Sequence, residues 1–250
     1  MKAPSVFEKY AHEYDILTNA VAREKNHRLE VRVLIERFHP AAVLDAGCAS
    51  GLTAALFARE KVRAVGLDRS ARMIAVAKEK YTGEALPLSF RTGHFERLPK
   101  SLNGKFDLVV CLANSISGVG TAAKLRASLK NFHRVLRPGG TLVLQTLNLS
   151  ALKDGEVMPV KGTQAGQIGY VRFARRRGQR MEISVVRLDL STEPFEFEPF
   201  VHETESFAPA RLADEVRKAG FVRIARYGDL LLTKPFRRNS RDFVITGTKS

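Results

Sequence analysis

The 250-residue sequence contains only two cysteines, Cys48 and Cys111, and no tryptophan. The cysteines lie far apart in apolar surroundings without the spacing of metal ligands, which argues against a zinc site or a disulfide-based scaffold. No apolar run approaches the roughly 20 residues that a membrane-spanning helix needs. The N-terminal residues 1–15 also lack the apolar segment of a signal peptide. These absences predict a cytoplasmic protein that binds no metal and no membrane.

Acidic residues are scarce relative to basic ones: 26 Asp and Glu stand against 41 Lys and Arg, and the formal net charge is +15. Such an excess is typical of proteins with an anionic partner such as RNA. The basic residues are nevertheless scattered, and their densest runs, 174–180 and 234–238, are short and typical of solvated turns. Because no nucleic-acid motif accompanies the charge, nucleic acid is the minority prediction and a small-molecule partner is favoured. Nothing in the sequence indicates the oligomeric state.

The rest of the chain is organised around residues 43–53, where an apolar run passes an acid and two glycines before a helical pattern begins. This pattern predicts a buried parallel strand, a loop that a ligand can approach closely, and a helix whose free N–H groups face that ligand. Gly47 and Gly51, with Ala49 between them, do not complete the G-x-G-x-x-G fingerprint of nicotinamide enzymes. Asp45, just before the first glycine, would repel a pyrophosphate. A cofactor with a positive end and no phosphate, such as S-adenosylmethionine (SAM), fits the loop better.

Strands and helices alternate over residues 42–146, which predicts a parallel sheet with helices on both faces. The expected strands are 42–46, 62–67, 86–91, 106–112 and 141–146, and the expected helices are 52–60, 70–81 and 121–136. After about residue 148 the pattern changes to strands at 168–173 and 181–190, followed by a segment, 193–200, whose prolines argue against a central strand. A helix at 209–219 and strands near 221–227 and 241–248 end the chain.

We therefore predict a single α/β domain over residues 1–250. Its expected parts are a helical cap (1–40), a cofactor-binding core (41–148), a β-rich insertion that covers the acceptor (149–206), and a helix with two strands that complete the sheet (207–250).

Five motifs in the expected order resemble those of class I SAM-dependent methyltransferases. They are 43–51 (VLDAGCASG), 65–70 (VGLDRS), 93–99 (GHFERLP), 106–112 (FDLVVCL) and 136–142 (LRPGGTL), preceded by an N-terminal segment, 7–15 (FEKYAHEYD), that resembles the cofactor-closing helix of this family. The resemblance implies a Rossmann-like, seven-stranded, mostly parallel sheet with an antiparallel last strand. It also implies SAM as the cofactor and S-adenosylhomocysteine as the product, with no metal.

The matching positions define the expected cofactor site. Asp45 is expected to face the methionine end, and Asp68, at the end of the next strand, to accept both ribose hydroxyls. An alternative role for Asp68 is a favourable charge at the N-terminus of the following helix. The full set of expected cofactor-binding residues is Tyr14, Arg23, Asp45, Ala46, Gly47, Ala49, Gly51, Asp68, Arg69, Met73, His94, Phe95, Cys111 and Leu112.

Two of these residues depart from the family pattern. Ala49 replaces the usual middle glycine, which is tolerable only if its backbone need not take a positive φ. His94 stands where an aspartate would accept the adenine amino group, and it either accepts there as a neutral imidazole or faces solvent. Phe95 is the better candidate for contact with the adenine face.

The acceptor side is less defined. The segment 111–115 (CLANS) resembles the glycine and sarcosine N-methyltransferase branch, and Arg23 matches an arginine that pairs with the cofactor carboxylate in that group. Asn114 either orients a ligand or caps the next turn. Candidate residues that line the lid are Tyr170, Phe195, Phe197, Phe200 and His202. The candidate catalytic residues are Tyr14 as a gate beside the methyl group, Asn114, and His202 as a base.

The favoured function is methyl transfer from SAM to a small molecule by direct displacement, which requires mainly alignment of the reactants. The alternatives are an RNA methyltransferase, a SAM-binding protein without turnover, and a nicotinamide oxidoreductase.

Overall fold

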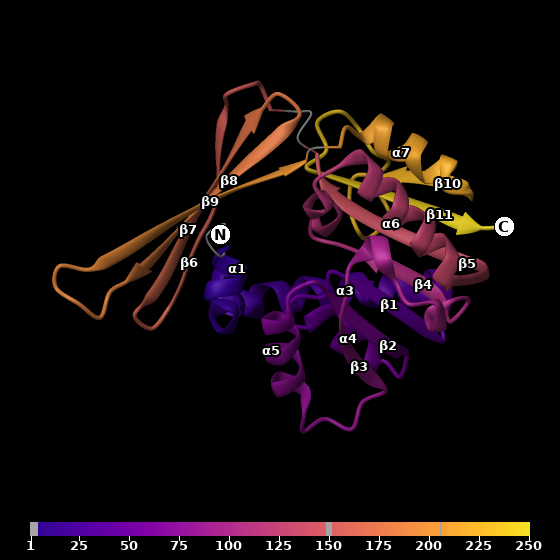
Figure 1. The fold of residues 1–250 in the computed structure, drawn as a ribbon, viewed down its shortest axis with the longest axis horizontal. Helices are drawn as coiled ribbons and strands as arrows, with labels where there is room; N and C mark the ends of the chain where they lie inside the picture. Colours follow the sequence, from indigo (N-terminus) through magenta and orange to yellow (C-terminus); the bar gives the residue numbers. More distant parts are fainter. Residues whose placement is uncertain (1–4, 149–151, 206) are drawn as a thin grey trace.

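The computed structural model describes residues 5–148, 152–205 and 207–250. Within these ranges the chain forms a seven-stranded sheet, in the order β10-β11-β5-β4-β1-β2-β3, and a separate four-stranded sheet (Figure 1). The strands of the larger sheet are β1 (Ala42–Ala46), β2 (Arg63–Asp68), β3 (Leu88–Thr92), β4 (Phe106–Cys111), β5 (Leu136–Leu147), β10 (Phe221–Tyr227) and β11 (Asp242–Lys249). Strands β1 to β5 pair in parallel, whereas β11 is antiparallel to both β5 and β10. The predicted Rossmann-like sheet with an antiparallel last strand is confirmed.

Helices cover both faces of this sheet, as the alternation of strands and helices predicts. One face is covered by α3 (Ala20–Phe38), α4 (Leu52–Arg59) and α5 (Ala71–Tyr81), and the other by α6 (Ala122–Val135) and α7 (Pro209–Lys218). Side-chain caps fix where two of the helices begin: the hydroxyl of Ser70 accepts from the N–H of Met73, and that of Thr121 accepts from the N–H of Lys124. Leu125, Leu129 and Phe132 recur at helical spacing on α6 and are fully buried.

The N-terminal segment precedes α3 and consists of short helices: α1 (Val6–Lys9), the 3₁₀ helix η1 (Ala11–Glu13) and α2 (Tyr14–Thr18). Asn19, with φ +54°, separates α2 from α3, and its side chain caps α3 by accepting from the N–H of Ala22. The segment lies beside both the core and the smaller sheet (Figure 1).

The smaller sheet consists of β6 (Val157–Ala165), β7 (Ile168–Arg177), β8 (Arg180–Asp189) and β9 (Glu196–Glu205), all antiparallel. β6 was not predicted because it contains Pro159 and Gly162 and its side chains are mostly exposed, so it lacks a clear apolar alternation. The proline-containing segment is β9, and it is an edge strand as its prolines require. The two predicted limits of the insertion, residues 149 and 206, lie outside the described residues.

Candidate functional site

The site begins at the loop between β1 and α4, at the carboxyl end of the parallel strands. Gly47 has φ +90° and donates its N–H to the carbonyl of Leu67 over 2.7 Å. A Cβ at this position would lie 2.5 Å from Oγ of Ser115 and 3.4 Å from the ring of Phe95. Gly51, with φ +87°, precedes the first residue of α4. A Cβ at Gly51 would lie 2.6 Å from the ring of Phe90, so both glycines are required by backbone conformation and by close packing.

Ala49, between the two glycines, has φ +47°, so the expectation that it avoids a positive φ is wrong. A left-handed conformation costs a residue with a Cβ about 1–2 kcal/mol. The backbone N–H of Ala49 donates to Oδ2 of Asp68 over 3.0 Å, and this hydrogen bond to a carboxylate offsets part of the cost. The loop conformation is thus held by the acid at the end of β2.

Two carboxyl groups lie at adjacent strand ends. Asp45 is 3% exposed, and its Oδ2 has no hydrogen-bond partner among the described residues. Burial, assisted by the negative charge of Asp68 and opposed by Arg23, raises the pKa of Asp45 from 3.8 to about 7. Asp68 is half-buried, and its two oxygens accept from the N–H groups of Ala49 and Ser70. The carboxyl group of Asp45 has a backbone hydrogen bond from Ala54, whereas its Oδ2 is a buried oxygen without a partner among the described residues.

Tyr14 and two arginines lie above these acids. The guanidinium of Arg23 lies over the Tyr14 ring, 5.4 Å from its centroid. Burial raises the pKa of Tyr14, and the charges of Arg23, Asp68 and Arg172 also act on it. Tyr14, Arg23, Asp45 and Asp68 are thus brought together as the sequence predicts, and Arg172 on β7 was not among the predicted residues.

The other predicted cofactor residues surround the same loop. Phe95 is half-buried on the 3₁₀ helix η2 (Phe95–Arg97) and packs against Phe132, with ring centroids 5.5 Å apart. His94 is exposed and makes no capping hydrogen bond. Arg69 is exposed and donates to the carbonyl of Gly118 over 3.2 Å. The remaining residues, Ala46, Met73, Cys111 and Leu112, are buried.

Asn114 ends a tight turn between β4 and the 3₁₀ helix η4 (Ser115–Val119), with φ +67°. Its Oδ1 accepts from Oγ of Ser117 over 2.9 Å and from the N–H of Leu147 over 3.4 Å. The side chain thus stabilises the turn that places Ser115 against Gly47. This geometry favours the structural role for Asn114.

One face of the smaller sheet is directed at the N-terminal segment. Because side chains alternate along a strand, Tyr170, Phe200 and His202 share this inner face through the register of β7, β8 and β9. His202 lies against Phe7, with ring centroids 5.5 Å apart, and burial together with the charge of Arg69 lowers its pKa. The prediction that Phe195 and Phe197 line the lid is wrong. Phe197 is 67% exposed and lies on the outer face of the sheet, where it pairs with Leu188. Phe195 is 55% exposed and precedes β9.

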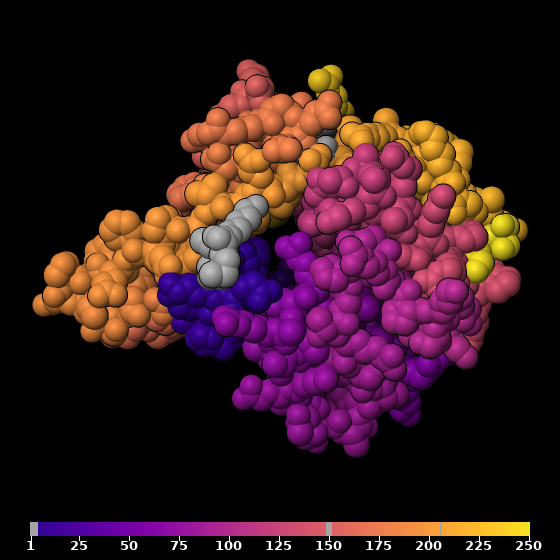
Figure 2. Space-filling view, in the orientation of Figure 1, coloured from indigo at the N-terminus to yellow at the C-terminus, as the bar shows by residue number. Residues whose placement is uncertain are grey.

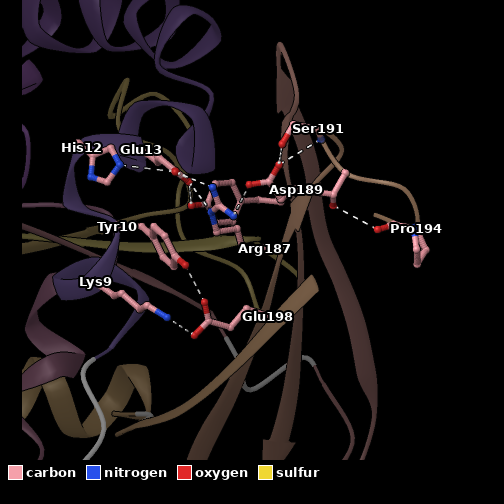
Figure 3. A network of polar contacts seen from close by, with 11 residues as sticks. Lys9, Tyr10, His12, Glu13, Arg187, Asp189, Ser191, Pro194 and Glu198 are labelled. Atoms are coloured by element: carbon pink, nitrogen blue, oxygen red, sulfur yellow. Dashed lines mark hydrogen bonds and ion pairs between the residues drawn. The ribbon is translucent and has the colours of Figure 1, made fainter. Parts of the chain in front are cut away.

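A polar network joins the N-terminal segment to this inner face (Figure 3). The guanidinium of Arg187 donates to both oxygens of Glu13 over 2.9 Å each, and the hydroxyl of Tyr170 donates to the same carboxylate. Glu198 accepts from Tyr10 over 2.7 Å and from Lys9 over 2.6 Å. Sequence reasoning missed this network because Glu13 and Arg187 are 174 residues apart. Glu13 lies in the segment 7–15, but Arg187 belongs to no motif that would have paired the two.

The N-terminal segment is also fastened to the core. Asp15 accepts from Oγ of Ser50 in the glycine loop over 2.8 Å and from Nζ of Lys80 on α5 over 2.6 Å. Figure 2 shows a hollow between this indigo segment and the purple and magenta core. The N-terminal segment, which borders this recess, is thus bound to the glycine loop through Ser50 and to the smaller sheet through Glu13.

Comparison with known proteins agrees with this architecture. Residues 43–140 match the family described as methyltransferase domain. A methyltransferase from Clostridium acetobutylicum, described as SAM-dependent, superposes with a TM-score of 0.78 at 15% identity over 98% of this chain and 99% of that one. SAM-bound CalS10, an amino pentose methyltransferase from Micromonospora echinaspora, superposes with a TM-score of 0.71 at 21% identity over 100% of this chain and 99% of that one. The chain therefore has the fold of these SAM-dependent methyltransferases, and its residues 43–140 are similar to the methyltransferase domain family.

Curated relatives match more locally. A malonyl-acyl-carrier protein O-methyltransferase from Hamiltonella defensa is 31% identical over 150 residues, which are 60% of this chain and 54% of that protein. A ubiquinone biosynthesis O-methyltransferase from Methylococcus capsulatus is 31% identical over 107 residues, 43% of this chain and 44% of that protein. The chain spans about half the length of the curated relatives that it matches.

No helix in the described residues is both long and apolar enough to cross a membrane. In the same ranges, no group of three or more His, Cys, Asp and Glu side chains could hold a metal ion.

Proposed function

We propose that the protein is a SAM-dependent methyltransferase that acts on a small-molecule acceptor. The observation that carries this proposal is the buried, unpartnered Oδ2 of Asp45, which lies beside a glycine loop with positive φ and is close enough to Arg23 for that charge to act on it. A buried carboxyl oxygen without a partner is costly unless a ligand satisfies it. A cationic amino-acid end, such as that of SAM, satisfies both Asp45 and Arg23.

The residues present fit this cofactor along its length. Asp45 would hold the ammonium side and Arg23 the carboxylate, while Asp68 has oxygens at the strand end for the ribose hydroxyls. Phe95 supplies an apolar ring for the adenine. We assign to Tyr14, which contacts the guanidinium of Arg23, the role of a gate beside the methyl group.

When bound, SAM would supply an electrophilic methyl carbon for transfer to the acceptor atom, with its sulfur as the leaving group. The protein has to align the acceptor and exclude water from the recess. We assign exclusion of water to the N-terminal segment and to the inner face of the smaller sheet as a lid. His202, on that face, is the candidate base for an acceptor atom that carries a proton.

The proposal is tested by calorimetric titration with SAM and, as the competitor, NADH, followed by incubation with methyl-labelled SAM and a fractionated cell extract. We expect SAM to bind, NADH not to bind, and label to appear in a low-molecular-weight fraction. Binding of SAM with no label in any fraction would instead indicate a binding protein without turnover. Preferential binding of NADH would indicate an oxidoreductase.

The net charge of +15 favours RNA as a second candidate acceptor. Binding that depends on phosphate contacts weakens steeply as salt increases. Titration of the SAM-saturated protein with tRNA at two salt concentrations separates the candidates. Tight, salt-sensitive binding with label transferred to the RNA would support the RNA acceptor, and the small-molecule proposal requires neither.

A further inference from the structure

Two arginines flank Tyr14, and neither has an acidic partner. Arg23 contacts the Tyr14 ring, and within the described ranges neither it nor Arg172 forms an ion pair. Nε of Arg172 is buried and has no hydrogen-bond partner among the described residues. The charged or titratable groups that act on Arg172 are Tyr14 and the like charge of Arg23, and burial lowers its pKa. Such an arrangement is unfavourable unless an anion enters between or beside the two guanidinium groups.

Arg187, a neighbouring arginine on the same face of the sheet, has a carboxylate partner of the kind that Arg172 lacks among the described residues. Arg187 lies opposite Tyr170 in the register and donates to both oxygens of Glu13. One row further along the sheet, Arg172 lies opposite Val185, which in turn lies opposite Phe200. On the other neighbouring strand, β6, the residue opposite Arg172 is Lys161. The residues paired across the sheet with Arg172 therefore include a second cation and no acid. The inner face of the lid therefore carries an unneutralised basic position.

The two arginines without an ion pair among the described residues differ in whether their charge acts on Asp45. Arg23 is among the charges that act on Asp45, and Arg172 is not. Arg23 thus lies toward the strand ends that would hold the cofactor, as its predicted pairing with the cofactor carboxylate requires. Arg172 belongs to β7 of the lid, and its charge acts on Tyr14.

We propose that Arg172 binds an anionic group, a carboxylate or a phosphate, of the methyl acceptor. This inference rests on the proposed function, because it assigns Arg23 to the cofactor and leaves Arg172 for the second ligand. A guanidinium pairs with either anion through parallel hydrogen bonds, and a half-buried position strengthens that pairing. The acceptor is then an acidic small molecule oriented by the lid.

The test uses the full chain saturated with S-adenosylhomocysteine and measures binding of three probes by calorimetry: malonate, inorganic phosphate and neutral malonamide. We expect saturable binding of malonate or phosphate and none of malonamide, with the preferred anion identifying the acidic group. Arg172→Gln should weaken binding of that anion at least tenfold, and Arg172→Lys, which keeps the cation, should weaken it less. The matched control is Arg177→Gln, because Arg177 lies on the outer face of the same strand and pairs with Glu182. This variant should bind the anion as tightly as wild type does.

The affinity for S-adenosylhomocysteine separates the possible failures. If Arg172→Gln lowers this affinity tenfold, Arg172 belongs to the cofactor site and the inference is overturned. Equal anion binding by wild type and Arg172→Gln overturns it as well, because the anions then bind elsewhere. If the wild-type protein does not bind S-adenosylhomocysteine at all, the proposed function fails instead. Far-ultraviolet circular dichroism of both Arg172 variants establishes that they are folded.

Discussion

Asp45 and Asp68 occupy equivalent strand ends but have different environments. Asp68 already accepts two backbone N–H groups, which hold its orientation whether or not a ligand is present. Asp45 is buried with an oxygen that has no partner within the described ranges, and it is partly neutralised by protonation near pH 7. Asp45 is therefore the acid whose charge changes near neutral pH, and the two acids differ in the contacts that a mutation would remove.

The raised pKa of Asp45 predicts a pH-dependent stability of the ligand-free protein. Because the pKa in the folded state, about 7, lies above the ordinary value of 3.8, the contribution of this group to stability is complete below about pH 4 and is lost as the pH rises through 7. Between these two limits of pH, the free energy of unfolding changes by about 4 kcal/mol because of this group. Chemical denaturation should show wild type losing stability relative to Asp45→Asn between pH 4 and pH 8. A constant difference between the two proteins would contradict the assignment.

Binding of SAM should show the opposite trend with pH. The cationic end of SAM favours the ionised carboxylate, so affinity should rise as the pH increases from 6 to 8, by up to tenfold per pH unit below the pKa of Asp45. Calorimetry at pH 6 in buffers of different ionisation enthalpy should detect a proton released on binding. Asp45→Asn should bind more weakly and with no such release.

Loss of the Asp68 carboxylate should weaken SAM binding more than tenfold. A hydrogen-bonded charged group contributes about 1.5–3 kcal/mol, and Asp68→Ala also frees the N–H of Ala49. Equilibrium binding of SAM measures the effect. The control is Asp154→Ala, which removes an acid that accepts from Gly178 in an exposed turn of the lid and should leave the affinity within about twofold. Unchanged affinity in Asp68→Ala would remove this residue from the site.

At the scale of the element, the glycine loop illustrates how far sequence can predict local structure. The order of strand, acid, loop and helix was readable because each step has a composition signal. The left-handed conformation of Ala49 was not readable, since alanine carries no signal for a positive φ and the Asp68 carboxylate that stabilises it is fixed by tertiary structure.

Substitutions at the two loop positions should have unequal effects. Gly47→Ala combines a left-handed strain with a Cβ that would lie 2.5 Å from Oγ of Ser115, and we expect it to cost about 2–4 kcal/mol of stability. Ala49→Gly relieves strain but makes the unfolded chain more flexible, so its stability should stay within about 1 kcal/mol of wild type. Thermal and chemical denaturation of both variants measure this. Equal destabilisation by the two would contradict the loop geometry.

At the scale of the whole molecule, the sequence predicted the larger sheet well and the relation between the two sheets poorly. Parallel strands with intervening helices leave few alternative topologies. The docking of the lid depends instead on Glu13, Arg187, Tyr170 and Glu198, which are ordinary polar residues until the fold brings them together. For the same reason Arg172 could not be separated from the many other arginines.

Neutralising Glu13 should loosen the contact between the N-terminal segment and the lid. Glu13→Gln leaves Arg187 without its carboxylate partner, although Asp189 remains 3.2 Å away. Breaking a buried ion pair costs about 3–5 kcal/mol, and we expect most of that cost as local opening. Hydrogen exchange should speed up in residues 6–18 and in β7 and β8, with little change in β1 and β4. Glu203→Gln, which weakens an exposed pair with Arg180, is the control and should alter exchange little.

The distance in sequence between Glu13 and Arg187 also bears on how the chain is made. At a synthesis rate of 5–20 residues per second, the 174 residues that separate them take roughly 10–35 s to appear. During that interval Val6 and Leu17, which are buried against Tyr170 and Val185 in the finished protein, have no partner on the lid. Val6 and Leu17 are thus synthesised well before their partners on the lid, and these apolar side chains are open to chaperones or to a neighbouring nascent chain until the lid has been synthesised.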